Sequence, residues 1–238
     1  MATINGTDSN DLLYGRGEDD TIKGLGGNDT IFASDGQDKL DGGDGNDELW
    51  GEGGSDNLKG QDGGDRLYGG VGDDNLKGQD GDDSLYGGSG NDSLLGGDGN
   101  DTLNGIGFNQ PPQGGSFGSD RSSPSIDVLT GGDGADTFVF QDTLAGRASG
   151  SLYTVAGNGD YGLIADFNKS EDLILLAKDQ RGFNIEQVTV EYSLSASPSG
   201  LPSGTAIFAN NIGAKPELIA IVSGVSPDSL SLSADYFI

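Results

Sequence analysis

The sequence predicts an all-β protein: a parallel β-roll, which is a solenoid of stacked short strands built from paired nonapeptides, followed by a β-rich C-terminal cap. Three observations carry this prediction. A nine-residue unit repeats eleven times between Gly6 and Asn104 without insertion or deletion. The sixth position of the unit is always Asp, and the eighth is always Leu or Ile. A longer pattern recurs every eighteen residues, since Asn57–Gly63 and Asn75–Gly81 both read NLKGQDG. Repeats of this length are typical of stacked, quasi-one-dimensional folds.

The composition by itself would favour disorder. The 238 residues carry a net charge of −27, only 32% of them are hydrophobic, and 45 are glycine. The acid excess argues against nucleic acid or an anionic membrane as a partner. No Cys and no His are present, so disulfides, zinc–thiolate sites, HExxH sites and Ser-His-Asp triads are excluded. The sequence has no apolar run of about 18 residues, so we expect no membrane span.

The order of residues within the unit explains a turn followed by a strand. Positions one to six are rich in Gly, Asp and Asn, which tolerate the left-handed backbone conformations of tight turns. Positions seven to nine read polar, apolar, variable, which predicts a strand of about three residues with one inward side chain. One such half-coil cannot bury its Leu, but two facing each other can. The eighteen-residue period therefore predicts that two nonapeptides make one coil and that alternate units stack directly over each other.

Stacking would align the invariant aspartates in two ladders along the two turn edges of the solenoid. The first ladder is predicted to hold Asp11, Asp29, Asp47, Asp65, Asp83 and Asp101, and the second Asp20, Asp38, Asp56, Asp74 and Asp92. Two further members, Asp127 and Asp136, belong to units that resume later in the chain. The turn carbonyls are expected from Gly43, Gly45, Gly54, Gly63, Gly70, Gly72, Gly81, Gly88, Gly90, Gly97 and Gly99.

Ionised carboxylates stacked about 4.8 Å apart would repel each other unless cations lay between them. The available ligands are carboxylate and carbonyl oxygens, which favour Ca²⁺ over transition metals. Five gaps in one ladder and four in the other predict up to nine calcium ions in the main array. The alternative, that these aspartates only cap turns and solvate an acidic face, does not explain eleven copies in one phase. We therefore predict a chain that is disordered without calcium and β-rich with it.

The repeat resembles the RTX (repeats-in-toxin, haemolysin-type) calcium-binding nonapeptide. Gly42–Trp50 and Gly96–Asn104 are near-ideal copies of that motif. The first four units depart from it, because Thr7, Arg16, Leu25 and Ser34 replace the second glycine; their calcium sites are the least certain on sequence grounds. The resemblance implies a parallel β-roll, multiple bound Ca²⁺ ions, and export by a type I secretion apparatus to the extracellular space. The first residues contain no basic and apolar signal regions, so we expect no cleavable N-terminal signal.

Position nine carries a second column. In alternate units it holds Tyr14, Phe32, Trp50, Tyr68 and Tyr86. Because position eight points inward, position nine is expected to point outward. One hypothesis is an exposed aromatic strip that binds a polysaccharide or a protein partner. The other, which we favour, is a ladder stabilised by its own stacking or covered by the C-terminal region.

The chain divides into three predicted parts. Residues 1–104 form the β-roll, and residues 105–126, rich in Pro, Ser and Gly, form an inserted loop. Residues 127–238 hold the last coils, where Phe138 takes the inward position as suits an ending coil, and then the β-rich cap and secretion region. Strands are expected at 161–167, 172–176, 188–194, 205–208 and 217–222. The flank Ile164–Phe167 with Asp172–Leu175, and the ending Asp235–Ile238, are similar to the region that follows RTX arrays in secreted proteins.

The sequence is compatible with three functions, two of them non-catalytic and one enzymatic. The first is a non-enzymatic secreted calcium-binding module with a structural or interaction role. The second is an auxiliary module of a larger RTX epimerase, protease or adhesin. The third is a small hydrolase that uses two carboxylates among Asp160, Asp166 and Asp172. About 100 residues leave little room for a catalytic cleft, so we expect no enzyme.

Overall fold

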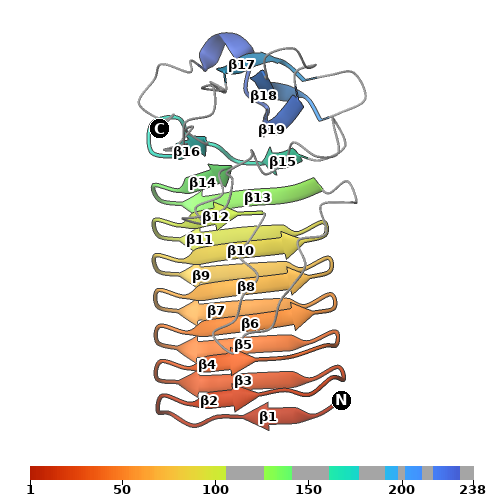
Figure 1. The fold of residues 1–238 in the computed structure, drawn as a ribbon. Coiled ribbons are helices and arrows are strands. Elements are labelled where there is room, and N and C mark those ends of the chain that lie inside the picture. The colour runs from red at the N-terminus through yellow and green to blue at the C-terminus, as the bar shows by residue number, and fades with distance from the viewer. Residues whose placement is uncertain (106–125, 141–160, 177–190, 198–201, 211–216, 231–238) are drawn as a thin grey trace, which may run out of the picture.

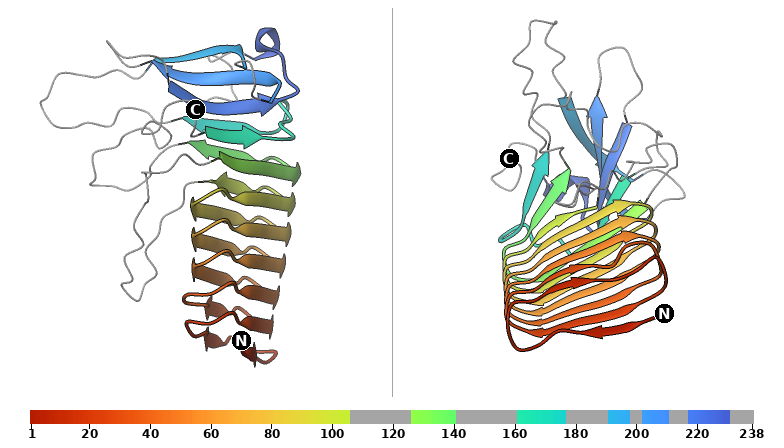
Figure 2. Two further views of the ribbon diagram at one scale, coloured as in Figure 1. Left: turned by 90° about the vertical axis from the view of Figure 1, so that its right-hand side faces the viewer. Right: turned by 60° about the horizontal axis from the view of Figure 1, so that its bottom comes forward.

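The computed structural model describes residues 1–105, 126–140, 161–176, 191–197, 202–210 and 217–230. In these residues the protein is all-β, a parallel β-solenoid with two facing sheets, one of which ends in three antiparallel strands at the C-terminal end (Figures 1 and 2). The only helical turn among the described residues is the 3₁₀ turn η1 (Pro227–Ser229). The predicted fold class is therefore confirmed.

One sheet has eleven strands, of which the first nine in spatial order pair in parallel. In spatial order they are β1 (Thr3–Asn5), β3 (Thr21–Gly26), β5 (Lys39–Asp44), β7 (Asn57–Asp62), β9 (Asn75–Asp80), β11 (Ser93–Asp98), β13 (Ile126–Asp133), β15 (Tyr161–Ile164), β19 (Glu217–Ser223), β18 (Gly204–Asn210) and β17 (Glu191–Ala196). The last three strands form antiparallel pairs, so the cap continues the same sheet.

The facing sheet has eight parallel strands. From the C-terminal end they are β16 (Leu173–Leu176), β14 (Thr137–Phe140), β12 (Thr102–Asn104), β10 (Ser84–Ser89), β8 (Arg66–Val71), β6 (Glu48–Gly53), β4 (Thr30–Phe32) and β2 (Leu12–Tyr14). The register confirms the eighteen-residue coil, since Leu58 lies opposite Leu76 and Tyr68 opposite Tyr86. The two sheets thus alternate along the chain, one strand from each per coil.

Most strands are longer than the three residues that the sequence predicts. Strand β7 runs from position seven of one unit through position three of the next, and β8, β9 and β10 do the same. The first two glycine-rich positions therefore remain in the ladder of parallel pairs, as Gly70 opposite Gly88 shows. The tight turn is confined to the remaining positions, which include the invariant aspartate at position six.

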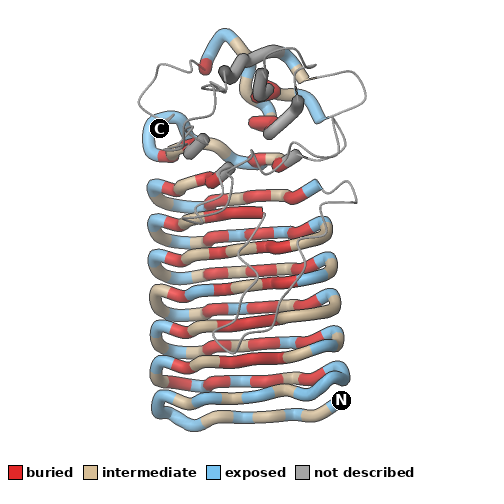
Figure 3. The backbone as a smooth tube through the Cα atoms, viewed as in Figure 1, coloured by how far each residue is buried: buried red, intermediate tan, exposed pale blue. Residues whose placement is uncertain are grey.

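The core is a narrow column of position-eight side chains between the sheets. Figure 3 shows buried residues recurring along the strands of successive coils. Leu49, Leu58, Leu67, Leu76 and Leu85 are all fully buried. The sequence predicted that the core column ends at Phe138, and this prediction is wrong. It continues through Ile164 of β15 and Ile174 of β16, and then into the cap with Ile207 and Val222. These later residues extend the core because β15 and β16 add one more coil in parallel register.

The array resumes after the predicted loop without a change of register. Leu94 of β11 lies opposite Leu129 of β13, which is 35 rather than eighteen residues later. Residues 106–125 of the predicted loop, residues 188–190 of the predicted strand at 188–194, and the predicted secretion tail 235–238 lie outside the described residues. The rest of that strand falls in β17, and the predicted strands at 161–167, 172–176, 205–208 and 217–222 correspond to β15, β16, β18 and β19.

A candidate calcium ladder in the stacked turns

The turn aspartates form the two predicted ladders. The backbone N–H of each ladder aspartate donates to Oδ1 of the aspartate in the next coil at 2.6–3.1 Å. One ladder contains Asp11, Asp29, Asp47, Asp65, Asp83, Asp101, Asp136 and Asp172. The other contains Asp20, Asp38, Asp56, Asp74, Asp92 and Asp127. Oδ1 of each rung thus accepts a backbone N–H from the preceding coil. The second oxygen, Oδ2, is not used in this bond and is the candidate ligand of the turn.

That second oxygen is buried without a hydrogen-bond partner in the interior rungs. The orphan Oδ2 atoms among the described residues belong to Asp29, Asp38, Asp47, Asp56, Asp65, Asp74, Asp83, Asp92, Asp101 and Asp136. Nine of these ten lie in residues 1–104, the number of gaps expected from the sequence. A buried carboxylate oxygen without a partner is costly, so each of these positions requires a compensating positive charge.

The rungs at the ends of the ladders differ. Oδ2 of Asp11 accepts the backbone N–H of Thr7 at 2.6 Å, and Oδ2 of Asp20 accepts that of Arg16 at 3.0 Å. Oδ2 of Asp172 accepts the N–H of Asn168 at 2.7 Å in the same way. In these turns the backbone itself satisfies the carboxylate. The two N-terminal turns, where the sequence departs from the motif, are therefore closed by hydrogen bonds.

The glycines predicted in the turns all adopt the left-handed conformation. Gly43, Gly45, Gly54, Gly63, Gly70, Gly72, Gly81, Gly88, Gly90, Gly97 and Gly99 have φ between 111° and 138°. Leu25 and Ser34 keep this conformation without glycine, with φ of 85° and 77°. The turns of the third and fourth units thus retain the interior geometry despite their sequence. Whether the glycine carbonyls bind metal remains a prediction.

The glycine at position one lies beside a small space between two coils that is lined by oxygen atoms, which we call the cradle. A Cβ placed on Gly42 would collide with the orphan Oδ2 of Asp47 and lie 2.8 Å from the carbonyl oxygen of Gly60 in the next coil. Gly51 faces Asp56 and the carbonyl oxygen of Gly69 in the same arrangement. Within the described part of the chain, no three acidic side chains converge on one point. The oxygens beside these glycines are carboxylate and backbone carbonyl oxygens, all hard ligands, which fit Ca²⁺.

Burial of these carboxylates opposes their ionisation in the absence of a cation. Burial raises the pKa of Asp56 to about 7, that of Asp74 to about 8 and that of Asp92 to about 9. Neighbouring ladder carboxylates raise these pKa values further. By contrast, the pKa of Asp20 is lowered, chiefly because Ala2 donates its backbone N–H to the carboxylate. The interior rungs are thus the ones whose charge needs compensation.

Asp172 is a rung of the ladder that the repeat pattern did not predict. Asp172 occupies position six of a degenerate unit, because the side chain two residues later, Ile174, is fully buried at the inward position. The Asp-x-Ile spacing is the signal that could have revealed it. Both oxygens of Asp172 accept backbone N–H bonds, and so do both oxygens of Asp166. This arrangement does not fit the catalytic role considered for the two residues, and Asp160 lies outside the described residues.

The aromatic column is a continuous stack on the eight-stranded sheet. The ring centroids of Trp50 and Tyr68 are 3.8 Å apart, and those of Tyr68 and Tyr86 are 5.0 Å apart. Phe32 stacks on Tyr14 at 5.5 Å and on Trp50 at 6.1 Å. Phe32 and Trp50 are buried, and Tyr14 at the end of the column is 49% exposed. The geometry favours the interpretation as a self-stacking ladder, and a polysaccharide or protein partner remains a hypothesis.

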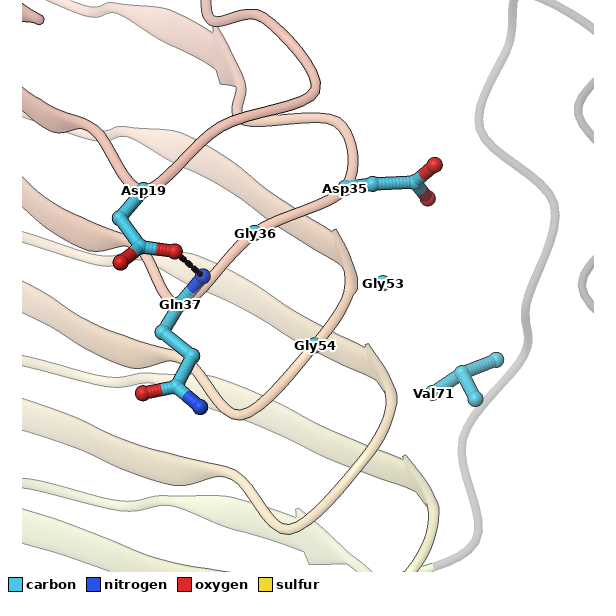
Figure 4. A pocket seen from close by; sticks show the side chains of 7 residues that line it. All are labelled: Asp19, Asp35, Gly36, Gln37, Gly53, Gly54 and Val71. Carbon is cyan, nitrogen blue, oxygen red and sulfur yellow. Dashed lines mark hydrogen bonds between the residues drawn. The ribbon is translucent and has the colours of Figure 1, made fainter. Parts of the chain in front are cut away.

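A shallow hollow lies outside the turns of the second ladder (Figure 4). Its lining consists of Asp19, Asp35, Gly36, Gln37, Gly53, Gly54 and Val71. Asp19 accepts the backbone N–H of Gln37 at 3.0 Å, and the Asp35 carboxylate points away from it. None of the orphan carboxylate oxygens belongs to these residues. The hollow therefore contains none of the orphan oxygens, although its lining includes Gly54, one of the predicted turn glycines.

Comparison with known proteins agrees with this geometry. A parallel β-solenoid with carboxylate ladders along both turn edges is the class that the fold and the site define. The model of the RTX calcium-binding nonapeptide repeat, in four copies, matches residues 3–31, 14–49, 23–58, 41–76, 50–83, 59–94, 77–105 and 123–140, just over half of the chain. The protein belongs to the RTX calcium-binding repeat family, and the calcium-binding β-roll predicted from the sequence is supported.

Other comparisons add little. The extracellular lipase LipA from Serratia marcescens aligns with 95% of this chain at 16% identity and a TM-score of 0.36. The alignment spans 40% of the length of the lipase. No curated protein matches the sequence. Among the described residues, no helix is long and apolar enough to cross a membrane.

Proposed function

We propose that this protein is a secreted calcium-binding module with a structural or interaction role, which folds when Ca²⁺ enters its stacked turns. The single observation that carries the proposal is the set of buried, partnerless Oδ2 atoms in the interior rungs. Without cations, these oxygens would lie desolvated in a chain of net charge −27. Nine ions in the gaps of residues 1–104 would balance the −18 formal charge of that segment.

The role of this chain's residues follows from their geometry. The ladder Oδ1 atoms hold successive turns in register through the backbone N–H bonds. The Oδ2 atoms and the neighbouring turn carbonyls would hold the ion, which when bound supplies the positive charge that the stacked carboxylates need. The position-one glycines leave the space for this cradle.

Extracellular location is part of the proposal. RTX membership supports export by a type I secretion apparatus, and extracellular calcium modules bind at about 10⁻⁴–10⁻³ M. Sites of that affinity stay empty in the cytosol, so the chain would remain unfolded until it reaches calcium outside the cell. An auxiliary role within a larger RTX protein is the second candidate. It is favoured by the uncovered edge strands β1 and β2, because Leu12 in β2 is 57% exposed.

Circular dichroism with ion counting tests the proposal. In excess chelator at neutral pH we expect a disordered spectrum, and in millimolar calcium a β-rich one with several ions bound per chain. Equal β content in both conditions, or no bound calcium, would refute calcium-coupled folding. Mass measurement of the native secreted species separates an independent protein from a module of a larger one.

A further inference from the structure

The outer face of the eleven-stranded sheet carries a column of lysines on a chain that is strongly acidic overall. Positions seven and nine of the unit point away from the core, because position eight between them points into it. At position nine, successive coils carry Lys23, Asp41, Lys59, Lys77 and Leu95, which lie opposite one another in the parallel register. Lys59 and Lys77 therefore occupy neighbouring strands, about 4.8 Å apart.

The lower part of this column is neutralised within the protein. Oδ2 of Asp41 lies 4.0 Å from Nζ of Lys23, and Oδ1 of Asp41 accepts an N–H from Nε2 of Gln61 at 2.7 Å. Gln61 follows Lys59 by two residues on strand β7, so it lies on the same face and bonds to the preceding coil. Among the described residues, neither Lys59 nor Lys77 forms an ion pair. The positive charge of the column is thus uncompensated at these two lysines.

Gln79 repeats the position of Gln61 one coil later but lacks its acceptor. Gln61 and Gln79 are paired in register. Asp41 and Lys59 are paired too, so the preceding coil offers Gln79 a lysine in place of the aspartate. Nε2 of Gln79 is the one side-chain nitrogen in the described part of the chain that is buried without a hydrogen-bond partner. A buried donor without an acceptor is costly, and two ammonium groups beside it favour an acceptor with negative charge.

We propose that Lys59, Lys77 and the amide of Gln79 form a binding site for a sulfate ester group of an extracellular polysaccharide. Two ammonium groups and an amide N–H supply three donors from separate residues, which match the three terminal oxygens of a sulfate ester. The site requires the folded roll, because Lys59 and Lys77 become neighbours only through the pairing of β7 with β9. The inference rests on the proposed function and gives its interaction role a class of partner.

The side chains around the lysine pair favour an anion carried on a sugar over a free ion. Leu95 lies opposite Lys77 on strand β11 and is 38% exposed, so it offers an apolar contact to the C–H face of a sugar ring. Asn57 and Asn75 occupy position seven of the two strands that carry the lysines. Their amide groups are suited to hydrogen bonds with sugar hydroxyl groups. The charged pair is thus flanked by apolar and polar surface.

Bound calcium would control access of an anion to this face. Residues 1–104 contain 24 acidic and 6 basic residues, a formal charge of −18 that repels anions in the absence of metal. Nine calcium ions would balance that charge, and the two lysines would then dominate the local potential within the screening length of about 8 Å. We therefore expect the sulfate group to bind the calcium-loaded protein and not the chelated chain.

Isothermal titration calorimetry of the full-length chain in saturating calcium tests the site. The probe is a κ-carrageenan tetrasaccharide, which carries sulfate esters and no carboxylate, and the desulfated tetrasaccharide is its control. We expect only the sulfated form to bind, and Lys59→Gln and Lys77→Gln each to weaken it roughly tenfold. Gln79→Glu should abolish binding, because the new carboxylate would pair with the ammonium groups. Lys169→Gln, an exposed lysine outside this face, changes the net charge equally and should bind as the wild type does.

Two further measurements identify the source of the anion. Inorganic sulfate should bind more weakly than the tetrasaccharide, and Leu95→Ala should weaken the tetrasaccharide alone. Equal affinity for a galacturonate trisaccharide would overturn the choice of sulfate. Equal weakening by Lys169→Gln, or undiminished binding to Gln79→Glu, would overturn the site itself.

Calcium per chain and β content are measured on every variant, so that loss of the fold is distinguished from loss of the site. A wild-type chain that holds its calcium and is β-rich but binds no sulfated tetrasaccharide would overturn this inference and leave the proposed function standing. A wild-type chain that binds no calcium would instead refute the proposed function. The two failures are therefore distinguishable.

Discussion

The backbone N–H of Asp74 donates to Oδ1 of Asp92 at 2.9 Å, while Oδ2 of Asp92 is buried with no hydrogen-bond partner. The same carboxylate thus stabilises the stacking of two coils and creates an electrostatic cost within it. This double role explains why the ladder is both the scaffold of the solenoid and its candidate cation site. It also makes the consequences of single substitutions specific.

Replacing Asp74 by Asn tests the ladder in its middle. We expect the variant to lose at least one calcium ion and to unfold at higher calcium than the wild type, since the amide cannot supply the orphan anionic oxygen. A site filled at 100 times its Kd contributes about 2.7 kcal/mol, so the free energy of unfolding at saturating calcium should fall by a similar amount. Urea unfolding at fixed calcium measures it.

Asp80→Asn is the matched control for that substitution. Asp80 is exposed at position three of its unit, and its side chain is not part of the ladder. We expect its unfolding midpoint and its ion count to match those of the wild type. An equal loss in both variants would mean that net charge, not the ladder, governs calcium binding.

The raised pKa values predict an inverted pH dependence without calcium. The pKa values of Asp65 and Asp83 in the folded state are raised to about 7, and that of Asp92 to about 9, against 3.8 for an ordinary Asp. The folded state therefore holds protons that the unfolded chain has released. Protonation of these groups therefore contributes to the free energy of unfolding. This contribution is fully present below about pH 4 and is lost as the pH rises through 7 to 9.

In chelator, acidification from pH 8 towards pH 5 should thus increase β structure, as measured by circular dichroism. In saturating calcium the direction reverses, because protons compete with the ion for the same oxygens. A chelated protein whose β content falls on acidification would contradict the assigned burial of the ladder.

The turn glycines should differ sharply in their tolerance of a side chain. Gly72 has φ of 129°, and a Cβ there would collide with the carbonyl group of Gly54 in the preceding coil. Gly72→Ala should therefore lower the free energy of unfolding in calcium by more than about 1 kcal/mol. Gly17→Ala is the control, because no atom lies within 4 Å of its added Cβ. Thermal melts of both variants provide the comparison.

Trp50 reports on the aromatic column. It is 5% exposed and stacks on Tyr68 at 3.8 Å, so its emission in calcium should be blue-shifted and resistant to iodide quenching. Chelation should shift it to the red. Addition of soluble polysaccharides should leave it unchanged if the column serves only to stabilise the sheet. Saturable quenching by one of them would support a binding role instead.

The repeat architecture can be read from the sequence, because position six and position eight are constrained in every coil by the same two requirements. Asp must reach the next turn and Leu or Ile must fill a narrow core, so eleven copies reveal the period. The two ladders, the eighteen-residue register and the aromatic stack followed from that period alone. The nine gaps of the array correspond to nine orphan oxygens in residues 1–104 of the structure.

The three-dimensional arrangement of the coils, in contrast, was needed to show which oxygens lack a partner and where the ladder ends. Thr7 and Arg16 close their turns with local N–H bonds, whereas Leu25 and Ser34 keep the open, left-handed turn without glycine. Asp172 joins the ladder although 36 residues separate it from Asp136. The motif does not predict these differences, because the partners of each carboxylate depend on the folded conformation of its own turn and on the coil stacked above it. The stacked coil can be distant in sequence.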